Sequence, residues 1–207
     1  MNTSKKLQLS AWLLGGLTVF LALFVWWPAT ENLTVYSLFP IFGLIAFGLM
    51  WTHYITGALR RYFAVPSETI KRYFQITSYI VLFSILVHPF LLDFQLFLDG
   101  NGLPPFSRNA IYTEGIQQFA IFLGTVSLVF FLLYELHRFF KDRSWWKYIE
   151  YANIAAMFLI LYHGFTLGGN LREPWFQVVW AFYAVSLLVA VIYTELKKRN
   201  TPSEKIA

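Results

Sequence analysis

Two histidines lie inside long apolar stretches of the chain, where an ionisable side chain is costly to bury and is therefore a candidate for function. His88 lies in KRYFQITSYIVLFSILVHPFLLDF, and His163 lies in SWWKYIEYANIAAMFLILYHG. Both stretches begin with basic residues, so both helices are expected to enter a membrane from the same side. At a rise of about 1.5 Å per residue, each histidine lies roughly 23–25 Å along its helix. The pattern therefore predicts two imidazoles at one depth, in the outer half of the bilayer.

Two facing imidazoles at one depth are suited to bind the iron of a single haem b as its axial ligands. A flat macrocycle needs room between the helices, which small side chains one to three turns before each histidine would provide. These are Ser84, Val81 and Thr77 before His88, and Ala156, Ala155 and Ala152 before His163. The alternative is that both histidines only form hydrogen bonds within a packed bundle, with the small residues serving helix packing.

The composition is that of a membrane protein. The chain has 207 residues, of which 57% are hydrophobic, 20% aromatic and only 13% charged, whereas soluble domains average about 45–50% apolar and 25% charged residues. The sequence holds no cysteine, which excludes disulfides, iron–sulfur ligation and thiol catalysis. Its length suits one all-α transmembrane domain over residues 1–207.

Six transmembrane helices are predicted, because each span needs roughly 20 mostly apolar residues. All but two of the 16 Lys and Arg residues then lie on one side of the membrane, the exceptions being Arg108 and Arg172. By the positive-inside rule, both termini are cytoplasmic and the protein is a multi-pass protein of the cell inner (plasma) membrane. Lipid rather than nucleic acid is the expected partner of the net charge of +5. The spans are about 9–28, 36–58, 73–97, 114–137, 147–168 and 175–195.

Four further residues are candidates for roles near a cofactor. Arg108 and Arg172 are predicted to lie near the haem propionates, although either could simply cap a loop. His53 lies in the inner part of the second span and could help to hold an inner cofactor or a quinone. His137 adjoins Arg138 at the cytoplasmic boundary, where an interfacial side chain commonly snorkels to water.

The layout resembles the ferric-reductase-like transmembrane family. The resemblance covers about residues 36–195 and depends on ligands in the third and fifth spans, in SILVHPFLL and SWWKYIEYANIAAMFLILYHG. That family includes the membrane domains of ferric reductases and NADPH oxidases, and the haem-binding membrane subunit of the bacterial periplasmic methionine-sulfoxide reductase. The resemblance implies a membrane oxidoreductase component that transfers electrons through haem.

The outer ligand pair of that family carries over to His88 and His163, but the inner pair does not. Two-haem members have a second histidine about four turns further inward on the same two spans. Here those places hold Glu150 on one span and Gln75 or Phe74 on the other. Either there is one haem, with a quinone or a flavin such as FMN as inner donor, or His53 and His137 form an unusual second site.

The partners follow from this interpretation. The family's flavin- and nicotinamide-binding domain is not part of this sequence, so a separate flavoprotein or a quinone is the expected donor, with a redox partner on the outer side. The alternative function is a non-redox bundle, such as a transporter or structural subunit, with histidines in packing or proton-relay roles. The sequence shows no paired broken helices of the kind common in transporters.

Overall fold

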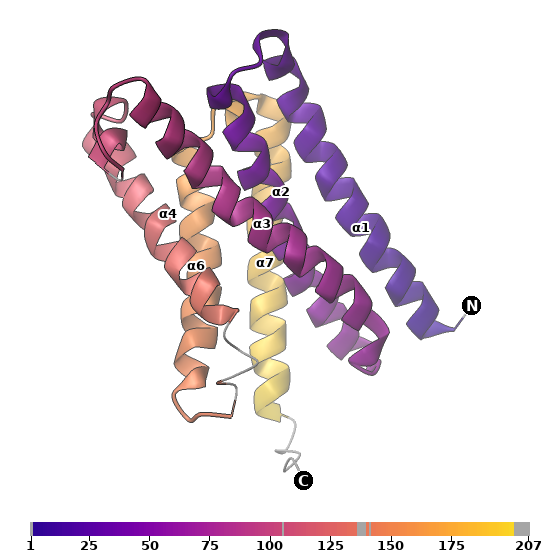
Figure 1. The fold of residues 1–207 in the computed structure, drawn as a ribbon. Coiled ribbons are helices and arrows are strands. Elements are labelled where there is room, and N and C mark those ends of the chain that lie inside the picture. The colour runs from indigo at the N-terminus through magenta and orange to yellow at the C-terminus, as the bar shows by residue number, and fades with distance from the viewer. Residues whose placement is uncertain (1, 105, 136–139, 141, 201–207) are drawn as a thin grey trace.

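The computed structural model describes residues 2–104, 106–135, 140 and 142–200, and all regular secondary structure in that part of the chain is helical. In the described residues, six long helices run alternately up and down, so that the start of α1 and the end of α7 lie toward the same end of the bundle (Figure 1). The long helices are α1 (Thr3–Trp26), α2 (Val35–Tyr62), α3 (Glu68–Leu98), α4 (Gly115–Tyr134), α6 (Trp146–Leu167) and α7 (Pro174–Asn200). Short 3-10 helices are η1 (Trp27–Asn32), η2 (Phe106–Ala110) and η3 (Gly169–Arg172).

The prediction of an all-helical multi-pass membrane protein is confirmed in its main features. Five helices in the described residues, α1, α2, α3, α4 and α7, are long and apolar enough to cross a membrane. The fifth predicted span, 147–168, forms α6 but is not among these five, because polar residues such as Lys147, Glu150 and Asn153 lie in its first half. Large apolar side chains cover the outside of the bundle, including Leu13, Phe83 and Val178, as expected for a surface that faces lipid.

Local sequence determines where α2 begins and ends. The Thr34 hydroxyl accepts a hydrogen bond from the backbone N–H of Ser37, and the Ser37 hydroxyl accepts one from the N–H of Thr34, forming a capping box. At the other end Ala64 adopts a positive φ of 51°, and the N–H of Val65 donates to the carbonyl of Arg60. This left-handed residue ends the helix and turns the chain back, so that α3 runs antiparallel along α2.

A face of small residues on α1 lets it approach its neighbours closely. Ala11, Gly15, Thr18 and Ala22 recur at helical spacing and are buried. A Cβ on Gly15 would lie 2.9 Å from the Tyr73 hydroxyl of α3. Small residues at helix interfaces favour this close packing in membranes, where the backbones gain van der Waals contact. Helix α1 is thereby packed onto α2 and α3.

The helices that surround the site form two antiparallel pairs. Helix α2 packs along α3, and α4 packs along α6. Helix α7 lies against α2, where Trp51 is 2% exposed and its indole N–H donates to the Ser186 hydroxyl at 3.0 Å. In the second pair, the Ser127 hydroxyl donates to the carbonyl of Ala156. The candidate site lies between the two pairs, because each pair contributes one of the two histidines.

Candidate functional site

The two histidines meet in the half of the bundle where α2 and α4 begin. His88 comes from α3 and His163 from α6. Their ring centroids are 6.5 Å apart, and their ring planes make an angle of 77°. An imidazole nitrogen lies about 2 Å from a bound transition metal, so two rings on opposite sides of one ion have centroids roughly 6 Å apart. The observed spacing therefore suits a single iron held between the rings.

Each ring is held by a hydrogen bond to the backbone of a neighbouring helix. His88 Nδ1 lies 2.8 Å from the carbonyl oxygen of Phe39 in α2, and His163 Nδ1 lies 2.8 Å from that of Ala120 in α4. A carbonyl can only accept, so Nδ1 carries the proton in both rings. The lone pair of each neutral imidazole is then on Nε2. This tautomer is the one in which a backbone partner orients a histidine for metal ligation through its other nitrogen.

Two glycines give the rings the space to lie against these helices. Gly43 follows Phe39 by one turn of α2, and Gly124 follows Ala120 by one turn of α4. A Cβ on Gly43 would lie 2.9 Å from His88 Cε1, and a Cβ on Gly124 would lie 2.5 Å from His163 Nδ1. Neither approach is tolerable without moving a ring. The two helix pairs therefore share one arrangement. A backbone carbonyl and a glycine of α2 position the histidine of α3, and the same two groups of α4 position the histidine of α6.

Both histidines line a cavity of about 490 Å³, a volume within the usual range of small-molecule sites. Its wall is mostly apolar and is contributed by α2, α3, α4, α6, α7 and the segments that connect α1 to α2, α3 to α4 and α6 to α7. The expectation that small residues before each histidine provide the room is wrong, because Ser84 and Ala156 are buried elsewhere in the bundle and are not among the lining residues. The space next to each ring comes instead from Gly43 and Gly124.

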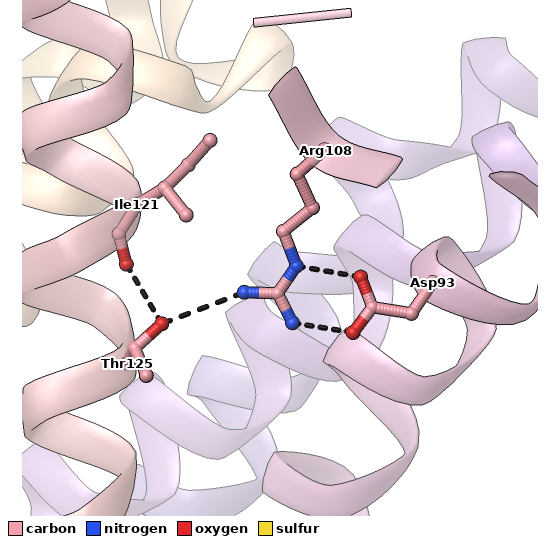
Figure 2. Close-up of polar contacts among 4 residues, drawn as sticks. All are labelled: Asp93, Arg108, Ile121 and Thr125. Carbon is pink, nitrogen blue, oxygen red and sulfur yellow. Dashed lines mark hydrogen bonds and ion pairs between the residues drawn. The ribbon is translucent and has the colours of Figure 1, made fainter. Parts of the chain in front are cut away.

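Arg108 of η2, drawn in Figure 2, is the charged side chain that lines the cavity near the connection between α3 and α4. Its guanidinium donates to both carboxylate oxygens of Asp93 in α3, at 2.5 Å each, and at 3.4 Å to the Thr125 hydroxyl of α4. Tyr112 also lines this end, and burial raises the pKa of its phenol, which stays neutral at physiological pH. Arg172 ends η3 and is exposed, although the three residues before it line the cavity.

A second cavity, of about 960 Å³, lies in the other half of the bundle, where α2 ends and α3 begins. Charged side chains at its wall include Arg61, Glu150, Glu195 and Lys198. Its deeper wall is apolar, and Met50, Ile85 and Phe131 line both this cavity and the one that contains His88 and His163. One layer of side chains therefore separates the two chambers.

His53 belongs to the second cavity and is not brought to the other two histidines. Its Nε2 lies 2.6 Å from the Thr77 hydroxyl, which donates to the carbonyl of Tyr73 at 2.7 Å. Since the hydroxyl proton is used on that carbonyl, the His53 Nε2–H is the donor to Thr77. His53 thus keeps Nδ1 as its accepting nitrogen. His137, the other member of the predicted second site, lies outside the described residues.

Sequence reasoning did not identify three of the residues that shape the site, namely Gly43, Gly124 and Asp93 as the partner of Arg108. The glycines have a recognisable signal, because each lies in an apolar helix where glycine has no local role. Within the described residues, no group of three or more His, Cys, Asp or Glu side chains is arranged to hold a metal ion. The site is therefore a pair of imidazoles in an apolar chamber.

Comparison of the chain with protein-family models, with curated proteins and with solved structures found no match. The assignment of a function consequently depends on the geometry just described.

Proposed function

We propose that the chain is a haem b-containing transmembrane electron-transfer protein, in which His88 and His163 are the axial ligands of one haem. The observation that carries the proposal is the pair of rings at 6.5 Å, each with Nδ1 bound to a carbonyl of an adjacent helix. Two imidazoles are fewer than the usual four ligands of a structural metal site, whereas a haem brings four nitrogen donors of its own. The apolar cavity beside the rings supports the same choice.

When bound, the haem would supply one-electron chemistry, and the protein would position it and tune its potential. The Phe39 and Ala120 carbonyls keep both ligands in the Nδ1–H tautomer and raise their basicity. Arg108, which lines the cavity, and Arg172 are the proposed neighbours of the haem propionates. The apolar wall excludes water, which favours a confined low-dielectric site.

The inner cavity is the proposed place for the electron donor, a quinol or a reduced flavin. It opens among charged residues at the inner end, and one layer of side chains separates it from the chamber with His88 and His163. His53 contributes a neutral ring whose Nδ1 can accept a proton there. Electrons would then pass outward to a redox partner on the opposite face of the membrane. A separate flavoprotein could reduce a flavin donor again after each transfer.

An optical spectrum tests the proposed function directly. The protein is purified in detergent from cells supplied with haem, and its reduced-minus-oxidised spectrum is recorded. We expect the sharp bands of six-coordinate low-spin haem b, with one haem per chain. A colourless preparation of folded protein would contradict the proposal. Two haems per chain would instead support the predicted second haem site at His53 and His137. Mixing the oxidised protein with a short-chain quinol or with reduced FMN then identifies the class of donor.

The proposed orientation places both termini in the cytoplasm of a cell and the segment between α3 and α4 outside, because basic residues are retained on the cytoplasmic side. The chain holds no cysteine, so single cysteines can report its topology. In intact cells a membrane-impermeant thiol reagent is expected to label Leu103→Cys, at a residue that is 70% exposed, and to leave Lys6→Cys unlabelled. Permeabilised cells provide the control, in which both are labelled. The opposite pattern in intact cells would reverse the orientation.

A further inference from the structure

The ion pair between Asp93 and Arg108 joins the two sides of the haem cavity. Arg108 projects from η2 between α3 and α4 and binds both oxygens of Asp93 in a fork at 2.5 Å each (Figure 2). Its remaining nitrogen contacts Thr125, the residue that follows Gly124 on α4. Since Gly124 is the residue against which His163 packs, the pair lies close to the backbone of α4 that positions His163.

Both members of this pair are largely shielded from water. Their side chains are each 16% exposed, and Arg108 is also part of the cavity wall. Charges in such surroundings are screened little by salt and interact over longer distances than charges at a surface. A bidentate arginine–carboxylate pair is in addition held in one geometry. The two opposite charges therefore nearly cancel at the outer end of the cavity. Removal of either one would leave a single charge that changes the electrostatic potential in the cavity strongly.

Resting on the haem site proposed above, we propose that the Asp93–Arg108 pair sets the reduction potential of the bound haem, with Asp93 acting as a positioning residue for Arg108. Reduction takes one electron from the donor and adds one negative charge at the iron. A lone cation at the cavity wall favours this change, and a lone carboxylate opposes it. Asp93 balances the charge of Arg108 and holds its guanidinium at the outer end of the cavity.

Asp93→Asn is the decisive variant, because it keeps the shape of the side chain and arginine stays protonated at any working pH. It leaves Arg108 as an uncompensated cation, and the haem is expected to become easier to reduce. Coulomb's law with an effective dielectric constant of about 20 gives roughly a tenfold change in the reduction equilibrium for one unit charge about 12 Å away. The measurement is a redox titration of purified protein, followed by its optical spectrum.

Arg108→Gln is expected to shift the equilibrium by about the same factor in the opposite direction. The double variant D93N/R108Q removes both charges and should return to within about twofold of the wild type. Asp99→Asn is the matched control. Asp99 is an exposed carboxylate of the same outer end, bound to Tyr36 and Gln95, so its loss changes the net charge equally but is screened by water.

An unchanged or lowered potential in Asp93→Asn would overturn the inference, and so would equal shifts in Asp93→Asn and Asp99→Asn. If the ion pair only stabilised the fold, both single variants would lose haem, and their reduction potentials would not move in opposite directions. If Asp93→Asn does not fold, Arg108→Gln and the exchanged pair D93R/R108D decide between the two outcomes. The exchanged pair is expected to titrate near the wild-type value. A wild-type protein without haem would refute the proposed function itself, before any variant is titrated.

Discussion

Alanine in place of His88 or His163 is expected to abolish the six-coordinate haem b spectrum and to lower haem affinity by more than about 100-fold, since loss of a group that merely orients a metal ligand already costs 10–100-fold. Each substitution removes a proposed haem ligand and also the imidazole that donates to the carbonyl of Phe39 or Ala120. The measurement is the reduced spectrum of detergent-purified protein, together with haem content per chain.

His53→Ala is the matched control for these variants. It removes a histidine from the inner cavity, away from the paired rings, and the spectrum is expected to stay that of the wild type. Free imidazole should restore six-coordinate bands in His163→Ala, because the small molecule can fill the space that the truncated side chain leaves. Retention of the wild-type spectrum in either ligand variant would refute the ligand assignment.

Gly124→Ala is the second substitution with a large expected effect, although it adds only one methyl group. That carbon would lie 2.5 Å from His163 Nδ1 and 2.6 Å from Cε1, so the ring must move away from α4. Moving it breaks the hydrogen bond to Ala120, one turn earlier on the same helix. We expect haem affinity to fall by about 10–100-fold, the usual cost of losing a partner that orients a metal ligand.

The glycines of the bundle provide a graded series for this test. Gly43→Ala should weaken haem binding less, because its added carbon would lie 2.9 Å from His88 Cε1. Gly16→Ala on α1 should have no effect, since nothing lies within 4 Å of the added carbon. Haem content and melting temperature are measured for all three, so that loss of the fold can be separated from loss of the site. Wild-type binding by Gly124→Ala would show that α4 does not orient His163.

The helices of this protein could be predicted from local sequence, because hydropathy and chain length determine which segments can cross a membrane. Predicted spans 36–58 and 114–137 correspond to α2 and α4, which differ mainly at their ends. Helix α2 extends a turn further because the left-handed Ala64, rather than a change in hydropathy, ends it. Cap geometry of this kind is determined by a few backbone dihedral angles, which composition does not reveal.

The pairing of His88 with His163 could be anticipated from depth alone. Helical rise converts residue number into depth, and the structure places the two rings side by side. The source of the space around them could not be anticipated. Sequence reasoning assigned it to small residues on the same helices, such as Ser84, whereas Gly43 and Gly124 provide it from the neighbouring helices. Which face of one helix meets another depends on the packing of the whole bundle.

From its sequence alone, the chain was determined to be an apolar helical membrane protein with two histidines at matching depths, because hydropathy and helical rise act along one segment at a time. Only the tertiary structure decided that both Nδ1 atoms bind carbonyls of adjacent helices, and that Asp93 holds Arg108 at the cavity wall. The structure also shows that His53 lines the second cavity and not the one that contains His88 and His163. These contacts join residues of different helices, and their geometry follows from how the helices cross.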